Sequence, residues 1–212
     1  MTDLAETNRE RVSRRQVDKF SERRAQLADA ALQTLAELGY ARTSLREIAQ
    51  NSQFSHGVLH YYFSDKEDLI THCVRQYEAA CVTRYDEIVA AAGSATELKR
   101  EFSAAMAQTL RTDASMHRLW YDLRNQSLFE ESFRTDVLEI NQRREEMIWR
   151  VISRYAEFTG ITVTLSPSAA YAILDGLFQQ ALLQLLAGHD EAAEELRSNV
   201  VAVLDSLAKF PA

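Results

Sequence analysis

The 212-residue chain has few of the residues that make turns and cross-links: six glycines, two prolines and two cysteines. So few turn residues exclude a turn-rich β protein and favour an all-α fold. Cys73 and Cys81 fall about two turns apart on one predicted helix, too far to bridge each other, so reduced structural thiols are favoured over a redox switch. No apolar run approaches the ~20 residues that cross a bilayer, and the N-terminus is not signal-like. We expect a cytoplasmic protein with no membrane partner.

The chain also has fewer positive than negative side chains. It contains 24 Lys and Arg and 31 Asp and Glu, which gives a net charge of −7. This balance at first argues against DNA binding. Residues 1–64, however, hold nine basic and eight acidic residues, so the acidic excess belongs to the rest of the chain. Affinity for DNA depends on the charge at the contact surface. The N-terminal part therefore remains a candidate DNA reader.

The segment 43–69 has the pattern of a helix-turn-helix. Ser44 opens an S-x-x-E sequence, the form in which the serine oxygen caps a helix start. Leu45 and Ile48 then give this helix an apolar face, and Asn51 and Ser52 end it because both favour turns. The pattern predicts a short helix from about Leu45.

A second helix is predicted from Ser55 through Phe63. Leu59 and Phe63, four residues apart, face the core. The opposite side carries hydrogen-bonding groups, rings and a bare backbone: His56, Gly57, His60 and Tyr61. A helix fits the major groove, where such side chains reach bases and phosphates. We interpret this face as the recognition surface.

A third helix is predicted to start at the S-x-x-E sequence of Ser64, where free N–H groups and the Lys66 ammonium suggest a phosphate clamp. We expect base or groove contacts from Arg46, His56 and Tyr61, and phosphate contacts from Thr43, Tyr62 and Lys66. The full set of candidate DNA-binding residues is Thr43, Ser44, Arg46, Gln53, Ser55, His56, Gly57, Val58, His60, Tyr61, Tyr62 and Lys66.

The spacing of residues over 27–69 resembles the TetR family of bacterial transcriptional regulators. The residues that carry the resemblance are Leu27, Ala30, Ala31, Leu35, Gly39, Tyr40, Thr43, Ser44, Ile48, Ala49, Ser55, Gly57, Leu59, Tyr62, Phe63, Lys66 and Glu67. Gln53 departs from the family's usual turn glycine, which implies modest strain or a different connection. His60 replaces a usual tyrosine and puts that residue's phosphate contact in doubt. The resemblance implies an N-terminal three-helix helix-turn-helix domain followed by a C-terminal helical ligand-binding and dimerisation domain.

Three parts are expected along the chain. Residues 1–20 form a flexible basic N-terminal arm, either a solvated tail or a segment that follows the DNA backbone or enters the minor groove. Residues 21–65 form the DNA-binding domain, and residues 66–212 form the ligand-binding and dimerisation domain. Within the last part, amphipathic patterns predict helices over 66–92, from 94 onward, and over 115–129, 131–158, 167–187 and 190–209.

Large apolar and aromatic side chains recur on the central helices. They either fill a core or, as the family resemblance implies, line a cavity for a small molecule. The candidate ligand-binding residues are Phe102, Met106, Trp120, Leu123, Phe133, Trp149, Ile152 and Phe178. The ligand itself cannot be read from the sequence.

The last two predicted helices have apolar faces wider than one neighbour covers. Two such pairs from two chains make a four-helix interface across a two-fold axis, and a monomeric core is the alternative. The candidate dimerisation residues are Leu174, Phe178, Leu182, Leu185, Leu196, Val200, Val203 and Leu207. A homodimer places two recognition helices about 34–36 Å apart, which suits a pseudo-palindromic operator.

Enzymatic function is not expected. His56 and His60 have metal-ligand spacing, but no cysteine or carboxylate completes a site, and no catalytic motif surrounds the other histidines. We therefore expect no cofactor, no metal and no catalytic residue. The predicted function is a repressor that binds double-stranded operator DNA as a homodimer. A small-molecule effector releases the repressor from the DNA. The alternatives are a ligand-independent architectural or adaptor protein and an enzyme with a vestigial reader.

Overall fold

The computed structural model describes residues 8–207, with side chains from residue 17 onward. Within this range the chain forms α-helices and one 3-10 helix and contains no strand. The predicted all-α fold is therefore confirmed. The chain divides into two compact units, residues 1–76 and 77–212, which are described separately.

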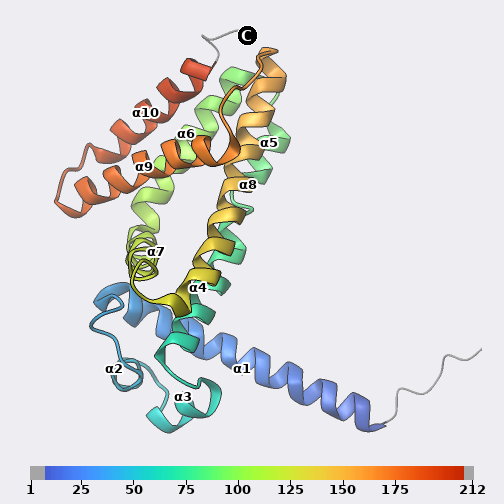
Figure 1. Ribbon diagram of the computed structural model, residues 1–212, viewed down its shortest axis with the longest axis vertical. Coiled ribbons are helices and arrows are strands. Elements are labelled where there is room, and N and C mark those ends of the chain that lie inside the picture. The colour runs from blue at the N-terminus through green and yellow to red at the C-terminus, as the bar shows by residue number, and fades with distance from the viewer. Residues whose placement is uncertain (1–7, 208–212) are drawn as a thin grey trace, which may run out of the picture. The chain divides into compact units, whose positions relative to one another are not determined.

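The N-terminal unit is a small helical domain (Figure 1). It consists of α1 (Asn8–Leu38), α2 (Leu45–Gln50), α3 (His56–Tyr62) and the first part of α4 (Lys66–Cys81). Its core is made by apolar side chains that are almost completely buried: Leu27, Leu35, Ile48, Leu59, Phe63 and Leu69. Three of them, Ile48, Leu59 and Phe63, are positions that the helical periodicity assigned to the inside.

Serine caps begin α2 and α3 as the sequence predicts. The Glu47 N–H donates to Ser44 Oγ at 3.2 Å, and the Val58 N–H donates to Ser55 Oγ at 3.3 Å. Each bond satisfies a backbone donor that the first turn of a helix leaves free.

The predicted serine cap of α4 is wrong. Asp65, not Ser64, accepts the Asp68 N–H, at 2.8 Å, while the Asp68 carboxylate accepts the Ser64 N–H at 3.1 Å. Carboxylates accept backbone hydrogen bonds more strongly than hydroxyls do, so two aspartates displace the serine from this role.

Two expected boundaries also differ. Residues 1–7 of the expected flexible arm lie outside the described residues, whereas 8–20 belong to α1. The expected boundary after residue 65 moves to 76, because the first part of α4 packs in the N-terminal unit. The Cys73 thiol donates to the Ala28 carbonyl at 3.3 Å, and Gln76 donates to Asp29 at 2.7 Å.

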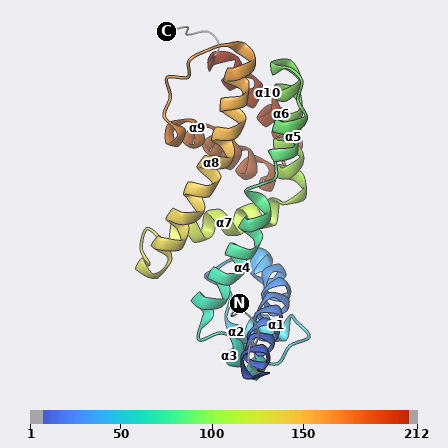
Figure 2. The same ribbon diagram turned by 90° about the vertical axis from the view of Figure 1, so that its right-hand side faces the viewer.

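The C-terminal unit contains the end of α4 and the remaining helices. These are α5 (Asp86–Ala91), α6 (Ala95–Thr112), α7 (Ala114–Gln126), η1 (Glu131–Phe133), α8 (Arg134–Thr159), α9 (Pro167–Leu186) and α10 (Ala192–Leu207). α10 packs against both α6 and α9, and α9 packs against α8 (Figures 1 and 2). Gly160 and Gly188 follow α8 and α9 with φ of 69° and 92°, a conformation that glycine adopts without strain.

A single long helix over 66–92 was predicted, and that prediction is wrong. α4 ends at Cys81, and α5 begins at Asp86. Arg84, in the intervening turn, forms an ion pair of 2.5 Å with Asp113, and the next residue, Tyr85, is buried edge-on against the Phe102 ring. These contacts join residues distant in sequence, so local periodicity gave no sign of the break.

α9 is long and apolar enough to cross a membrane by length and composition alone, which corrects the expectation that no such segment exists. This is weak evidence for a membrane span, because the core helix of a soluble protein passes the same test. α9 also carries Asp175, whose buried carboxylate pairs with Arg124.

Candidate nucleic-acid interface and ligand cavity

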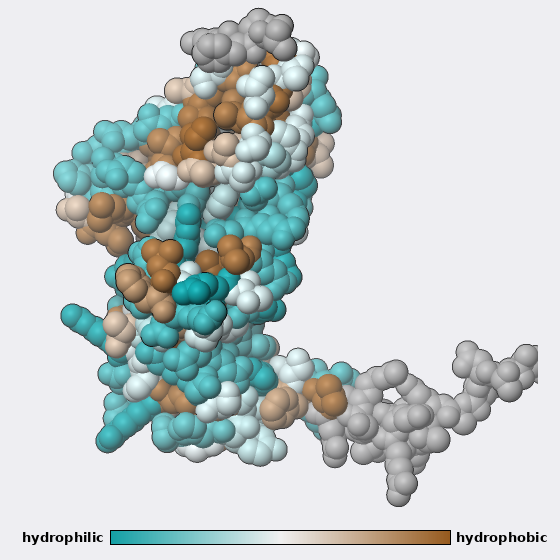
Figure 3. Space-filling model, in the orientation of Figure 1, coloured by the Kyte–Doolittle hydropathy of each residue, from teal (hydrophilic) through white to brown (hydrophobic). Residues whose placement is uncertain are grey.

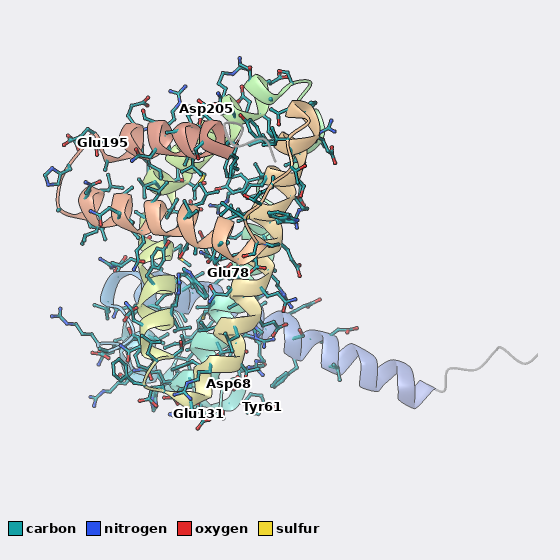
Figure 4. The ribbon with its side chains drawn as sticks, turned by 45° about the horizontal axis from the view of Figure 1, so that its top comes forward. Tyr61, Asp68, Glu78, Glu131, Glu195 and Asp205 are labelled. Atoms are coloured by element: carbon teal, nitrogen blue, oxygen red, sulfur yellow. The ribbon has the colours of Figure 1, made fainter. Side chains whose placement is uncertain are left out.

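The α2–α3 surface exposes most of the candidate DNA-binding residues. Arg46, Gln53, Ser55, His56, Gly57, His60 and Tyr61 are exposed, whereas Ser44, Val58, Tyr62 and Lys66 are half-buried. Tyr61 is 73% exposed, which is unusual for a large aromatic side chain. Figure 4 labels it on α3.

His56 and His60 act as one polar unit on this surface. Their Nε2 atoms lie 3.1 Å apart, and the rings meet edge to face with centroids 4.4 Å apart. One imidazole therefore donates to the other, and each keeps its Nδ1 for an outside partner. No group of three or more potential metal ligands occurs among the residues that the structure describes.

Gly57 leaves bare backbone in the first turn of α3. A Cβ added there meets no heavy atom within 4 Å, and the residue does not have a positive φ. Neither packing nor backbone conformation therefore requires glycine at this position. The free space is on the exposed side of the helix, where another molecule can approach the backbone closely.

Two expected phosphate contacts need correction. Thr43 is buried, and its hydroxyl donates to the Gly39 carbonyl at 2.7 Å, so it has no proton to offer a phosphate. The Lys66 ammonium donates to the backbone carbonyl of Tyr40 at 2.8 Å. Its nitrogen lies 3.8 Å from the centroid of the Tyr40 ring. Its ammonium keeps two further donors but is partly committed to the fold.

Sequence reasoning missed Phe20, which lies beside the recognition helix. Its ring lies 4.8 Å from the Tyr62 ring and 6.2 Å from the Tyr61 ring, centroid to centroid. Phe20 was overlooked because it falls at the end of the segment expected to be a flexible arm.

A cavity of about 50 Å³ lies within the C-terminal unit. It is lined by Tyr85, Met106, His117, Tyr121, Arg144, Met147, Ile148, Tyr171, Leu174, Asp175 and Phe178. Only Met106 and Phe178 come from the predicted ligand-binding set. The others in that set do not line it: Phe102, Trp120, Leu123, Phe133 and Ile152 are buried core, and Trp149 is half-buried elsewhere.

Asp175 organises the polar part of the cavity wall. It accepts hydrogen bonds from the hydroxyls of Tyr121 at 3.0 Å and Tyr171 at 3.3 Å, and it pairs with Arg124. Burial, followed by the negative charge of Asp175, raises the pKa of both tyrosines. Burial likewise raises the pKa of Tyr85 to about 12. All three phenols stay protonated as donors at neutral pH.

Arg144 from α8 meets Glu78 from α4 on the inside of the C-terminal unit; Figure 4 labels Glu78. The guanidinium makes two hydrogen bonds to the carboxylate, one of them 2.8 Å from Nε to Oε2, and lies over the Trp120 ring. Burial alone lowers the pKa of Arg144, but the charge and hydrogen bonds of Glu78 raise it above the ordinary value. The Arg144 guanidinium therefore keeps its charge.

His117, on α7, is a residue of the cavity wall whose hydrogen-bonding groups are unused. It is 7% exposed, and neither of its ring nitrogens has a hydrogen-bond partner among the described residues. Its ring lies 4.5 Å from the Phe178 ring, centroid to centroid. Burial, followed by the charges of Arg144 and Arg84, lowers its pKa well below 6.5. The imidazole is thus neutral, with one donor and one acceptor unused.

The chain's own unit covers most of the residues expected on the dimerisation face. Five of the candidate residues are buried within the chain's own unit: Leu174, Phe178, Leu182, Leu196 and Val200. Three are half-buried: Leu185, Val203 and Leu207. The apolar residues that α9 leaves exposed are instead Ile173, Leu183 and Leu186. Leu183 and Leu186 also border an open groove of about 460 Å³ between α7 and α9.

Together, the capped α2–α3 pair with its exposed recognition face and the separate helical unit define a helix-turn-helix transcriptional regulator. The sequence profile described as "Bacterial regulatory proteins, tetR family" matches residues 27–73. By this match residues 27–73 are similar to the TetR family, and the relatives described below are regulators rather than enzymes.

Curated relatives extend the likeness beyond the reader. The HTH-type transcriptional regulator BetI of Paraburkholderia phymatum is 27% identical over 187 residues, which cover 86% of this chain and 92% of that protein. BetI of Burkholderia mallei is 33% identical over 127 residues, 58% of this chain and 63% of that protein.

Solved structures share the fold at low identity. A TetR-family regulator from Rhodococcus sp. has a TM-score of 0.70 at 20% identity, covering 89% of this chain and all of that one. FadR from Bacillus subtilis, in complex with stearoyl-CoA, has a TM-score of 0.69 at 18% identity and covers 88% and 98%. A regulator from Saccharomonospora viridis, in complex with choline, has the same score and identity and covers 87% and 96%.

Proposed function

We propose that this chain is a cytoplasmic repressor that binds a pseudo-palindromic operator as a homodimer and is released by a small molecule. The N-terminal unit reads DNA, and the C-terminal unit binds the effector and the second copy. The observation that carries the proposal is the exposed face of α3, where the His56–His60 pair and Tyr61 surround the unobstructed backbone of Gly57.

The recognition face suits a DNA groove. Its rings and imidazole nitrogens reach base edges, while the missing Cβ of Gly57 lets the helix lie close to the sugar-phosphate backbone. Arg46, exposed on α2, supplies positive charge beside this face. The acidic balance of the whole chain is no obstacle, because affinity depends on the charge at the contact.

The cavity supports control by a small molecule. Structures of the same fold from Bacillus subtilis and Saccharomonospora viridis hold stearoyl-CoA and choline, so the fold accommodates ligands of different chemistry. In this chain, α4 carries Glu78 in the C-terminal unit and residues 66–76 in the N-terminal one. A ligand that moves Arg144 therefore acts on a helix that continues into the reader domain. Coupling of this kind is typically worth about 1–3 kcal/mol between two sites.

A two-fold dimer through α9 and α10 completes the proposal. α9 exposes Ile173, Leu183 and Leu186 on the side away from the chain's own core, and a second copy buries them. Figure 3 shows apolar surface gathered over the C-terminal unit beside α10. Glu195 and Asp205 lie on α10 (Figure 4), and Asp205 is paired with Lys99 at 2.5 Å.

The test is selection of DNA fragments by the purified full-length protein, followed by binding titrations on the selected sequence. We expect Tyr61→Ala to weaken operator binding by about 1–3 kcal/mol, the range for a specific groove contact. Phe129→Ala is the matched control, because Phe129 is 83% exposed but lies in the C-terminal unit. Selection of no common sequence, or equal loss in both variants, would contradict the proposal.

A further inference from the structure

We propose that His117 recognises the effector directly, and that the effector is an uncharged, largely apolar small molecule presenting one hydroxyl or carbonyl group to this imidazole. The inference rests on the proposed function, because it names the class of ligand for the cavity. It depends on three features of the wall: the unused hydrogen-bonding capacity of His117, the cancelled charges, and the adaptable apolar side chains.

The first feature is the unsatisfied imidazole. Buried polar groups in folded proteins nearly always have hydrogen-bond partners, and leaving one unpaired destabilises the protein. His117 lacks a partner for both ring nitrogens among the described residues and lines the cavity. A hydroxyl group matches it well, since a hydroxyl both donates and accepts.

The second feature is the charge balance. The cavity wall contains one positive and one negative side chain, Arg144 and Asp175. Each already has a partner of opposite charge: Arg144 pairs with Glu78, and Asp175 pairs with Arg124 and accepts from two tyrosines. A charged ligand must break one of these pairs or remain unpaired in a buried space, and either is costly. An uncharged ligand avoids both.

The third feature is the room available. About 50 Å³ is well below the ~300–1,000 Å³ of typical ligand pockets, so a ligand has to displace side chains. Met106 and Met147 lie in the wall, and methionine is the apolar side chain that adapts most readily to a new shape. Aromatic rings form much of the remainder, which favours a flat apolar ligand body.

The position of His117 also gives the ligand a route to α4. The His117 ring lies edge-on to the Tyr77 ring of α4, with centroids 6.4 Å apart. The Tyr77 hydroxyl donates to Asp113 at 3.1 Å, and Asp113 lies one turn before His117. A ligand that shifts the imidazole therefore presses on a residue of α4.

The test uses four probes that share a phenyl ring: benzyl alcohol, toluene, benzoate and benzyltrimethylammonium. Binding to the full-length protein is measured by calorimetry at millimolar probe concentrations. We expect benzyl alcohol to bind best, about tenfold more tightly than toluene, the factor that one hydrogen bond supplies. His117→Phe should remove that preference and His117→Asn should keep part of it, while His189→Phe, at an exposed histidine, should change nothing.

Three results would overturn the inference: tighter binding of either charged probe, an unchanged preference in His117→Phe, or no saturable binding of any probe. Operator release is followed in parallel to separate this inference from the proposed function. If benzyltrimethylammonium or benzoate releases operator DNA, the function stands and the inference fails. If benzyl alcohol binds through His117 without any effect on DNA, His117 contacts a ligand that is not the effector, so the inference fails while operator binding by the reader is unaffected.

Discussion

The guanidinium of Arg144 and the carboxylate of Glu78 form a two-point ion pair between α8 and α4, with side chains only 7% and 1% exposed. A charge at such depth is stable only while its partner remains, because water cannot solvate it. Since Glu78 is on α4 and Arg144 lines the cavity, the pair fixes part of the cavity wall to the C-terminal end of α4, a helix that begins in the N-terminal unit.

Removing one partner of this pair should be far more harmful than removing both. We expect Glu78→Gln to lower the free energy of unfolding by about 3–5 kcal/mol, because it leaves Arg144 charged and unpaired. The double change Glu78→Leu with Arg144→Met should recover most of that loss. Denaturant titration measures both, with Glu194→Gln as control, since its 3.5 Å pair with Arg197 is exposed. Equal losses in the single and double variants would show that the charges do not depend on each other.

Gly57→Ala should separate stability from DNA binding. An added methyl meets nothing within 4 Å, so the fold accepts it, and alanine should stabilise α3 by up to about 1 kcal/mol. The same methyl should weaken operator binding, because it occupies the surface that approaches the DNA. Thermal melts and binding titrations check the two effects, with Gln33→Ala, an exposed change on α1, as control. Unchanged operator affinity would mean that the DNA does not approach the backbone at Gly57.

The sequence was sufficient for the fold class and the reader because these depend on local signals. The serine caps at Ser44 and Ser55 act within one turn, and their effect is visible in a window of a few residues. The break between α4 and α5 was missed because Arg84 finds its partner, Asp113, far along the chain. A pattern within a few residues does not predict an ion pair between positions so far apart in the sequence.

The cavity was less predictable for a related reason. The predicted ligand-binding set consists of large apolar residues. Some of these, such as Phe102 and Phe133, are completely buried in the core and do not line the cavity. The cavity wall instead includes polar groups, among them His117 and Asp175, whose surroundings exist only after folding. Periodicity likewise placed Leu196 in the candidate dimerisation set, although the chain's own helices bury that residue.

Both cysteines should be unreactive in the folded protein. Burial is the main cause that raises the pKa of the Cys73 and Cys81 thiols, so little of the nucleophilic thiolate forms at neutral pH. We expect neither thiol to react with Ellman's reagent under native conditions, and both to react once the protein is unfolded. The rate of colour development with and without denaturant gives the comparison. Rapid reaction of one thiol in the native protein would contradict the buried, protonated state and favour a redox role.

His117 should make the protein less stable as the pH falls. In the unfolded chain the imidazole takes up a proton below its ordinary pKa of 6.5, whereas burial lowers the folded-state pKa and keeps the ring neutral. The unfolded state then binds more protons, so stability is lost progressively below pH 6.5 until the folded-state pKa is reached.

The size of this effect can be isolated by comparing the wild type with His117→Phe, since the other histidines are common to both. Between pH 7 and pH 5 the wild type should lose up to about 2 kcal/mol more than the variant, the limit for one proton bound only by the unfolded state. Denaturant titrations at a series of pH values give this difference. Parallel curves for the two proteins would mean that the folded protein protonates His117 as easily as the unfolded chain does. In that case a partner for the imidazole must exist in the folded state, and the argument that the ring is reserved for a ligand fails with it.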